Sequence, residues 1–270
     1  MSRLSRVGLV GCGAIGTYIA KLLNDKFKNQ ARLSFVNDLQ SEKAVELCRG
    51  VRARRAVPLQ TLISKSDLII EAAHADIIRQ LVPLSLKKNK SILVMSVGGL
   101  LSIANLDSLL AKTKGTIYVP SGAIAGIDAL SAAKQDGIRS VTITTRKPIR
   151  GLAGAPILKE KGINLDLIKG ETVLFEGTAR EAVKAFPQNV NVAAVVSLAT
   201  LGPDKVRVRV ITSPAYQKNS HEIIAEGKFG RIQTLVENEP SETNPKTSAL
   251  AQYSVAATLE KIFSKIKIGT

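Results

Sequence analysis

The sequence predicts an α/β protein: an N-terminal domain with a doubly wound parallel sheet, followed by a second α+β domain with a mixed or antiparallel sheet. Between residues 6 and 120, short apolar runs alternate with segments whose apolar residues recur at helical spacing. Strands that are apolar along nearly their whole length are typical of a parallel sheet covered on both faces. After Ser121, closely spaced strands joined by short turns indicate hairpins.

The first domain is expected to comprise residues 1–120 and a returning segment, 246–270. Each of its helices follows one strand and leads to the next, as in βαβ units. The strands are expected at residues 6–11, 31–38, 67–72, 91–97 and 116–120, and the helices at residues 14–26, 41–50, 58–64, 75–87 and 105–113.

The second domain is expected to comprise residues 121–245. One long helix is expected over residues 179–199, with a break or a kink at Pro187. Asn244-Pro-Lys-Thr is expected to open a final amphipathic helix that packs on the first domain. The other expected elements are a helix at residues 127–135 and strands at residues 140–146, 171–176, 205–212, 221–227 and 230–236.

Composition narrows the class of protein. The 270 residues include two cysteines, too few for a disulfide framework or a cysteine-based metal site. The sequence contains no Trp, which disfavours the stacking of nucleic-acid bases on aromatic side chains. No apolar run approaches the roughly 20 residues that cross a bilayer, and no signal peptide is recognisable, so we expect a cytoplasmic protein without a membrane partner. The net charge of +16 has two interpretations: it attracts anionic ligands, or it serves only to keep the protein soluble. Because the basic residues are scattered, we expect no nucleic-acid partner.

A glycine-rich turn follows the first strand. Gly11-Cys-Gly13-Ala14-Ile15-Gly16 closes that strand and opens a helix, as in the Rossmann dinucleotide-binding fold. The three glycines permit a tight turn, a close approach to a pyrophosphate and close helix packing, respectively. Cys12 is expected to fill space in this turn and not to act as a nucleophile.

Asp38 ends the second strand, 22 residues beyond Gly16, where a carboxylate can bind the adenosine ribose hydroxyls. Because Asp38 would repel a 2′-phosphate, NAD is expected to be preferred over NADP, although the nearby Lys43 leaves use of both open. Ala73, just after the strand at residues 67–72, is expected to contact the same cofactor.

The chain has two histidines, the side chains best suited to proton transfer near neutral pH. His74 follows the strand at residues 67–72, and its role stays open. His221 begins a strand of the second domain. Ser121, Lys246 and Thr247 are candidate donors to substrate carboxylates, because the segment 244–248 is expected to present a helix N-terminus.

Several longer segments resemble those of the L-aspartate dehydrogenase family, and the resemblance covers nearly the whole chain. Gly99 and Ile127 are small departures, where the family pattern has Ala and Leu. The segments are Ser96-Val-Gly-Gly-Leu100, Pro120-Ser-Gly-Ala-Ile-Ala-Gly-Ile-Asp128, Phe186-Pro-Gln-Asn-Val-Asn-Val-Ala193, His221-Glu and Asn244-Pro-Lys-Thr-Ser248.

The resemblance implies NAD(P)-dependent oxidative deamination of L-aspartate to iminoaspartate, which hydrolyses to oxaloacetate and ammonia or supplies NAD biosynthesis. It implies that His221 is the catalytic acid–base residue, that Ala123 and Asn189 contact the cofactor, and that the chain forms a homodimer. Alternatives remain open at this point: a related two-domain enzyme such as homoserine dehydrogenase or dihydrodipicolinate reductase, or a non-catalytic NAD sensor. The direction of the reaction in the cell also stays open.

Overall fold

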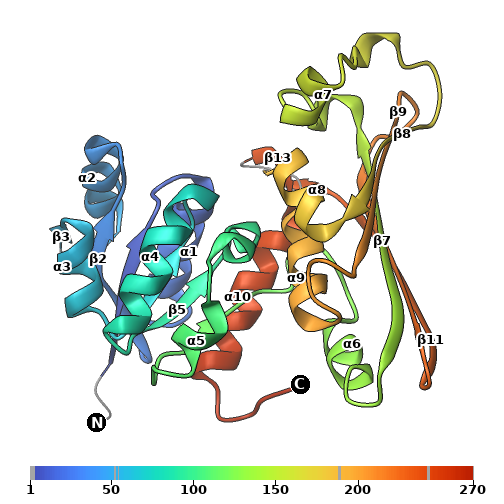
Figure 1. The fold of residues 1–270 in the computed structure, drawn as a ribbon. Coiled ribbons are helices and arrows are strands. Elements are labelled where there is room, and N and C mark those ends of the chain that lie inside the picture. The colour runs from blue at the N-terminus through green and yellow to red at the C-terminus, as the bar shows by residue number, and fades with distance from the viewer. Residues whose placement is uncertain (1–3, 52, 54, 188–189, 242–243, 270) are drawn as a thin grey trace. The chain divides into compact units, whose positions relative to one another are not determined.

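The computed structural model describes residues 4–51, 53, 55–187, 190–241 and 244–269 (Figure 1). Its internal contacts divide the chain into two compact units. Unit 1 comprises Met1–Pro120 and Val255–Ile266, and unit 2 comprises Ser121–Ser254 and Lys267–Thr270. The predicted fold class is confirmed: unit 1 is a parallel α/β unit and unit 2 has a mixed sheet.

Unit 1 is built on a parallel sheet. Its strands are β1 (Ser5–Val10), β2 (Ala31–Asn37), β3 (Arg55–Ala56), β4 (Leu68–Glu71), β5 (Ser91–Val94) and β6 (Ile117–Tyr118). Among the described residues these six strands lie in the order β3-β2-β1-β4-β5-β6, and every pair is parallel. The chain order reverses between β1 and β4, and open sheets of this kind bind ligands beyond the carboxyl ends of the strands at that point.

Helices connect the strands of unit 1. They are α1 (Ala14–Asp25), α2 (Ser41–Gly50), α3 (Leu59–Lys65), α4 (Ala75–Lys87), the 3-10 helix Val97–Ser102 and α5 (Leu106–Leu110). The C-terminal helix α10 (Ala249–Phe263) also contributes, since Val255 and Leu259 are buried in the unit 1 core with Leu23 and Phe27. The rings of Phe27 and Phe263 lie 5.6 Å apart.

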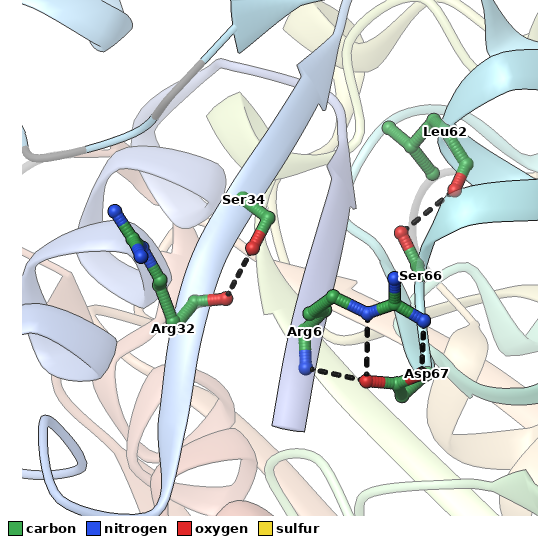
Figure 2. A network of polar contacts seen from close by, with 6 residues as sticks. All are labelled: Arg6, Arg32, Ser34, Leu62, Ser66 and Asp67. Carbon is green, nitrogen blue, oxygen red and sulfur yellow. Dashed lines mark hydrogen bonds and ion pairs between the residues drawn. The ribbon is translucent and has the colours of Figure 1, made fainter. Parts of the chain in front are cut away.

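An ion pair ties β1 to β4 at the end of the sheet opposite the glycine turn (Figure 2). Asp67 accepts hydrogen bonds from the Arg6 backbone N–H at 2.9 Å, from Arg6 Nε at 3.1 Å and from Arg6 Nη2 at 2.8 Å. Beside it, the Ser66 hydroxyl donates to the Leu62 carbonyl at 2.7 Å. Because both charged groups are partly exposed, the pair fixes geometry and adds little stability.

Unit 2 is built on a mixed sheet. Its strands are β7 (Ile138–Pro148), β8 (Thr172–Thr178), β9 (Arg207–Ser213), β10 (Asn219–Gly227) and β11 (Gly230–Asn238). In the described part of the chain these five strands lie in the order β11-β10-β7-β9-β8, where only β7 and β9 are parallel. A short separate ribbon pairs β12 (Pro240–Ser241) with β13 (Asn244–Ser248).

Helices of unit 2 lie along one face of this sheet in Figure 1, where α6, α8 and α9 are seen together. The helices are α6 (Ile127–Ala133), α7 (Pro156–Glu160), α8 (Ala179–Ala185), α9 (Asn191–Ala199) and the 3-10 helices Ile149–Gly151 and Leu165–Leu167. The residues of α9 from Val192 to Ser197 are all buried, so this helix forms part of the unit 2 core. Among the residues that the structure describes, no helix combines the length and apolar character needed to cross a membrane.

The structure differs from one of the two expected long helical segments and breaks the other. The segment at residues 179–199 is broken near Pro187 into α8 and α9, because the residue before a proline is forced out of the helical conformation. The expectation that Asn244-Pro-Lys-Thr opens the last helix is wrong. Those residues form β13, whose backbone pairs with β12, and α10 begins only at Ala249.

Candidate functional site

The glycine turn of unit 1 has the shape of a phosphate cradle. Gly11 has φ +97°, and a Cβ there would lie 2.4 Å from the Ala72 carbonyl oxygen. A Cβ on Gly16 would lie 2.0 Å from the Gly11 carbonyl oxygen, so neither glycine tolerates a side chain. A Cβ on Gly13, by contrast, would meet no protein atom within 4 Å. The space above Gly13 is therefore open to a ligand.

Helix α1 begins directly after this cradle, at Ala14 and Ile15. Its N-cap, Gly13, provides no side-chain hydrogen bond, and the first turn has no acidic residue. The first N–H groups of the helix and the positive end of its dipole are thus directed at the cradle, an arrangement that favours phosphate groups. The residues present fit the pyrophosphate of a dinucleotide.

Asp38 lies beside the same turn. Its Oδ2 accepts a hydrogen bond from the Cys12 backbone N–H at 2.7 Å, and its Oδ1 accepts one from the Gln40 N–H at 2.8 Å. The carboxylate therefore holds the glycine turn while remaining half-exposed. Burial and the charge of Asp38 raise the pKa of the Cys12 thiol to about 12, so this cysteine stays protonated.

Glu71, the last residue of β4, was not singled out from the sequence. Its fully buried carboxylate accepts backbone hydrogen bonds from Ala73 at 2.8 Å, Met95 at 3.0 Å and Ser96 at 2.9 Å. The Ser96 hydroxyl donates a further bond at 2.8 Å. Burial raises the pKa of Glu71, although these hydrogen bonds oppose the shift. Glu71 thereby fixes the loops after β4 and β5 at the ligand edge of the sheet; a Glu that ends an apolar strand was the available signal.

The two histidines differ sharply in environment. His74 precedes α4, has a side chain that is 56% exposed and lies 3.2 Å from the Asp76 carboxylate. His221 lies on β10 with only 4% of its surface exposed, and its Nδ1 lies 3.0 Å from the Thr145 hydroxyl on β7. Burial, together with the charge of Lys147, lowers the pKa of His221 to about 3. Its imidazole is therefore neutral at physiological pH.

Lys147 is a second functional candidate that sequence reasoning missed. It follows Thr145 by two residues on β7, so both side chains lie on the same face of the sheet. Only 5% of Lys147 is exposed, and burial lowers its pKa to about 8. The available signal was the alternation along this strand: Val141, Ile143 and Thr145 occupy buried positions, and a lysine occupies the next one.

Asn238 connects His221's surroundings to a predicted cofactor contact. Its Nδ2 donates to the Ala123 carbonyl at 3.1 Å, and it lies opposite Asn219 in the β10–β11 register, two residues from His221. Asn238 Oδ1 is buried and has no hydrogen-bond partner among the described residues. Nearby along the chain, the Gly122 N–H donates to the Ser254 hydroxyl at 3.1 Å.

The remaining predicted residues fall in different places. Gly11, Gly13, Gly16, Asp38 and Ala73 belong to unit 1, whereas Ser121, Ala123 and His221 belong to unit 2. Ser121 is half-buried. Asn189 lies outside the described residues. Lys246 and Thr247 lie in β13, so the helix N-terminus that motivated them as carboxylate donors is not there, and their side chains are outside the described part.

Comparisons with known proteins agree along the whole chain. A family model for the C-terminal part of aspartate dehydrogenase matches residues 128–262, and a model for the NAD binding domain of homoserine dehydrogenase matches residues 11–120. L-Aspartate dehydrogenase of Methanosarcina acetivorans is 46% identical over 270 residues, covering 98% of this chain and 99% of that protein. That of Methanococcus maripaludis strain C6 is 43% identical over 269 residues, with the same coverage.

Solved structures give the same result. The crystal structure of aspartate dehydrogenase from Thermotoga maritima matches with a TM-score of 0.74 and 28% identity, covering 99% of this chain and 100% of that one. Myo-inositol dehydrogenase from Lactobacillus casei, in complex with NAD(H) and myo-inositol, matches with a TM-score of 0.53 and 18% identity, covering 96% of this chain and 84% of that one. At that identity the second match shows the fold alone. On the family model and the full-length relatives together, this chain belongs to the L-aspartate dehydrogenase family.

Proposed function

We propose that this chain oxidatively deaminates L-aspartate to iminoaspartate with NAD(P), that NAD is the preferred cofactor, and that His221 is the acid–base residue. Iminoaspartate then hydrolyses to oxaloacetate and ammonia or is consumed in NAD biosynthesis. The observation that carries the proposal is His221 itself: a buried, neutral imidazole hydrogen-bonded to Thr145 beside a buried lysine.

The cofactor would be held by unit 1. The cradle above Gly13 and the first N–H groups of α1 would bind the pyrophosphate, and Asp38 would bind the adenosine ribose. A nicotinamide bound there would supply the acceptor for the hydride that leaves the substrate Cα. Glu71 keeps the loops after β4 and β5 in place at this edge, and so contributes to the shape of the site.

His221 would act as the general base that removes the proton from the substrate ammonium group. The bond between Cα and its hydrogen breaks as a hydride only when the substrate amine carries a lone pair, so the ammonium group must first lose a proton. His221 can take that proton on Nε2 if Nδ1–H donates to the Thr145 oxygen, 3.0 Å away. The same imidazole can later activate the water that attacks the imine. General acid–base help of this kind contributes typically ~10²–10⁴-fold to the rate.

Preference for NAD rests on the residues after β2. The Asp38 carboxylate would repel a 2′-phosphate, and the next residue, Leu39, is 97% exposed and supplies no positive charge. Lys43, exposed in the first turn of α2, is the nearest cation along the chain and leaves some use of NADP open.

The proposal is tested by following the absorbance of reduced nicotinamide. Purified protein is mixed with NAD or NADP and with L-aspartate, D-aspartate, L-glutamate or L-homoserine. A rate confined to L-aspartate supports the proposal. A rate on L-homoserine would reassign the substrate, and tight NAD binding with no rate on any amino acid would make the protein a sensor.

A further inference from the structure

A row of polar side chains crosses the buried face of the unit 2 sheet. In the β10–β7 register His221 lies opposite Thr145, so two residues further along each strand Asn219 and Lys147 share the same face. Lys147 lies opposite Thr212 of β9, and Asn219 lies opposite Asn238 of β11. We call these four residues the polar row: Thr212, Lys147, Asn219 and Asn238.

Every member of the polar row is at least nine-tenths buried. The row directly beside it contains Thr145 and His221, whereas the next one contains Ile143 and Ile223, both fully buried. Polar groups are thus concentrated at one end of an otherwise apolar face. Buried titratable and polar groups that gather at one end of a sheet face are typical of a functional site.

Lys147 brings a cation to this face. The Thr212 hydroxyl donates to the Lys147 carbonyl at 2.8 Å, which helps fix the backbone of β7 at this point. The lysine charge reaches His221, since it contributes to the lowered pKa of that imidazole. On the described strands of this sheet, Arg146, Glu222 and Glu237 alternate to the opposite face near this end, where Arg146 and Glu222 form an ion pair.

Asn238 brings a hydrogen-bond acceptor to the same row. Its amide orientation is set because Nδ2 donates to the Ala123 carbonyl, which leaves Oδ1 as the other end. That oxygen is buried without a partner among the described residues. A buried acceptor of this kind is completed by a donor on a ligand, and an ammonium group is a strong one.

On the basis of the proposed function, we propose that the polar row is the substrate subsite for an α-amino dicarboxylate: Lys147 binds one carboxylate, and Asn238 Oδ1 accepts a hydrogen bond from the ammonium group. The two groups lie on the same face as His221, which takes the ammonium proton. Pairing of a carboxylate with Lys147 also offsets the charge that His221 feels, so substrate binding strengthens His221 as a base. Lys147 thereby binds a substrate carboxylate and also makes His221 a stronger proton acceptor.

The test compares Lys147→Met, which keeps the length of the side chain and removes the charge, with Lys159→Met at an exposed lysine of α7. Succinate is the probe, because it has two carboxylates and no amine. Calorimetry on NADH-loaded protein gives its affinity, and steady-state kinetics give KM for L-aspartate. We expect Lys147→Met to lower the affinity for succinate and to raise KM for L-aspartate, each about 10- to 100-fold, the range for a charged hydrogen bond. NADH affinity and the Lys159→Met values should match those of the wild type.

Asn238→Ala separates the two parts of the subsite. Because succinate lacks the amine, this change should raise KM for L-aspartate about 10-fold and leave the affinity for succinate nearly unchanged. Equal weakening of both ligands would instead make Asn238 a support for the Ala123 loop and overturn its role as acceptor. Lys147→Gln, a second neutral variant, serves if Lys147→Met does not fold.

The subsite and the proposed function fail separately. If wild-type protein oxidises L-aspartate while Lys147→Met keeps its KM and its succinate affinity, the subsite is wrong and the function stands. If wild-type protein does not oxidise L-aspartate but binds succinate only when Lys147 is present, the function is wrong and the dicarboxylate subsite stands.

Discussion

His221 and Thr145 lie directly opposite each other on β10 and β7, with Nδ1 of the imidazole 3.0 Å from the threonine hydroxyl. This pairing comes from strands 76 residues apart in the chain. It holds the ring in one orientation and leaves Nε2 as the nitrogen that can meet a substrate. Catalysis by His221 should therefore depend on Thr145, which acts through the imidazole.

Thr145→Val should lower kcat about 10-fold, because the imidazole loses the partner that orients it. Cofactor affinity, measured by quenching of NADH fluorescence, should not change. The matched control is Thr144→Val, a buried threonine of the same strand whose side chain lies on the opposite face. Equal rates for the two variants would remove Thr145 from the mechanism.

His221→Ala should lower kcat ~10²–10⁴-fold, the range for losing a general acid–base group, and should leave NADH affinity intact. His74→Ala is the control, since that side chain is half-exposed and adjoins Asp76. Rapid-mixing measurements of the first turnover check that the lost step is chemical and not product release. A near-wild-type rate for His221→Ala would end the proposed role.

Folding stability should depend on pH through His221. Its pKa is about 3 in the folded protein and 6.5 in the unfolded chain, so the unfolded state binds the proton more strongly. The contribution is fully present above pH 6.5 and is lost as the pH falls toward 3. Between pH 6 and pH 5, the free energy of unfolding of the wild-type protein should fall by about 1 kcal/mol more than that of His221→Gln, as measured by urea titration. Parallel losses in both proteins would contradict the pKa shift.

Lys147→Met should stabilise the protein at neutral pH even as it weakens substrate binding. The pKa of Lys147 falls from 10.5 to about 8 on folding, so ionised Lys147 opposes folding at pH 7. Replacing it by an apolar side chain of similar size should add about 1–3 kcal/mol to the free energy of unfolding. The gain should shrink as the pH rises from 8 toward 10.5, where the folded wild-type lysine is already neutral. Thermal unfolding at pH 7 and pH 10 measures both effects.

Asp38→Ala should reduce the preference for NAD over NADP at least about 10-fold in kcat/KM, because the carboxylate no longer repels the 2′-phosphate. Asp38 also accepts the Cys12 N–H, so the loss of that bond should weaken both cofactors. Asp38→Asn separates these effects, since it removes the charge and keeps an acceptor oxygen. An unchanged cofactor ratio in both variants would rule out Asp38 as the selecting residue.

The nucleotide-binding half could be predicted from the sequence because its signals are local. The glycine turn, the first two strands and Asp38 all lie within residues 6–38, and each has a conformation or a position that its residue type favours. The β-strand register of unit 2 has no comparable local signal. Lys147 and Asn238 share a row only after β7, β10 and β11 have paired, and that pairing depends on tertiary packing.

The sequence pattern at residues 244–248 is misleading for a similar reason. Asn-Pro followed by polar residues is typical of a helix start, and an amphipathic helix does follow. The backbone instead pairs with Pro240 and Ser241, a short-range ribbon that propensity alone does not favour. Helix α10 then begins four residues after Pro245.

The buried carboxylate of Glu71 makes two separate loops dependent on one side chain. Its oxygens hold the backbone at Ala73 after β4 and at Met95 and Ser96 after β5. An engineer who alters either loop to admit another cofactor therefore changes the anchor of the other loop as well. The two loops should therefore be exchanged together with Glu71, or both left unchanged.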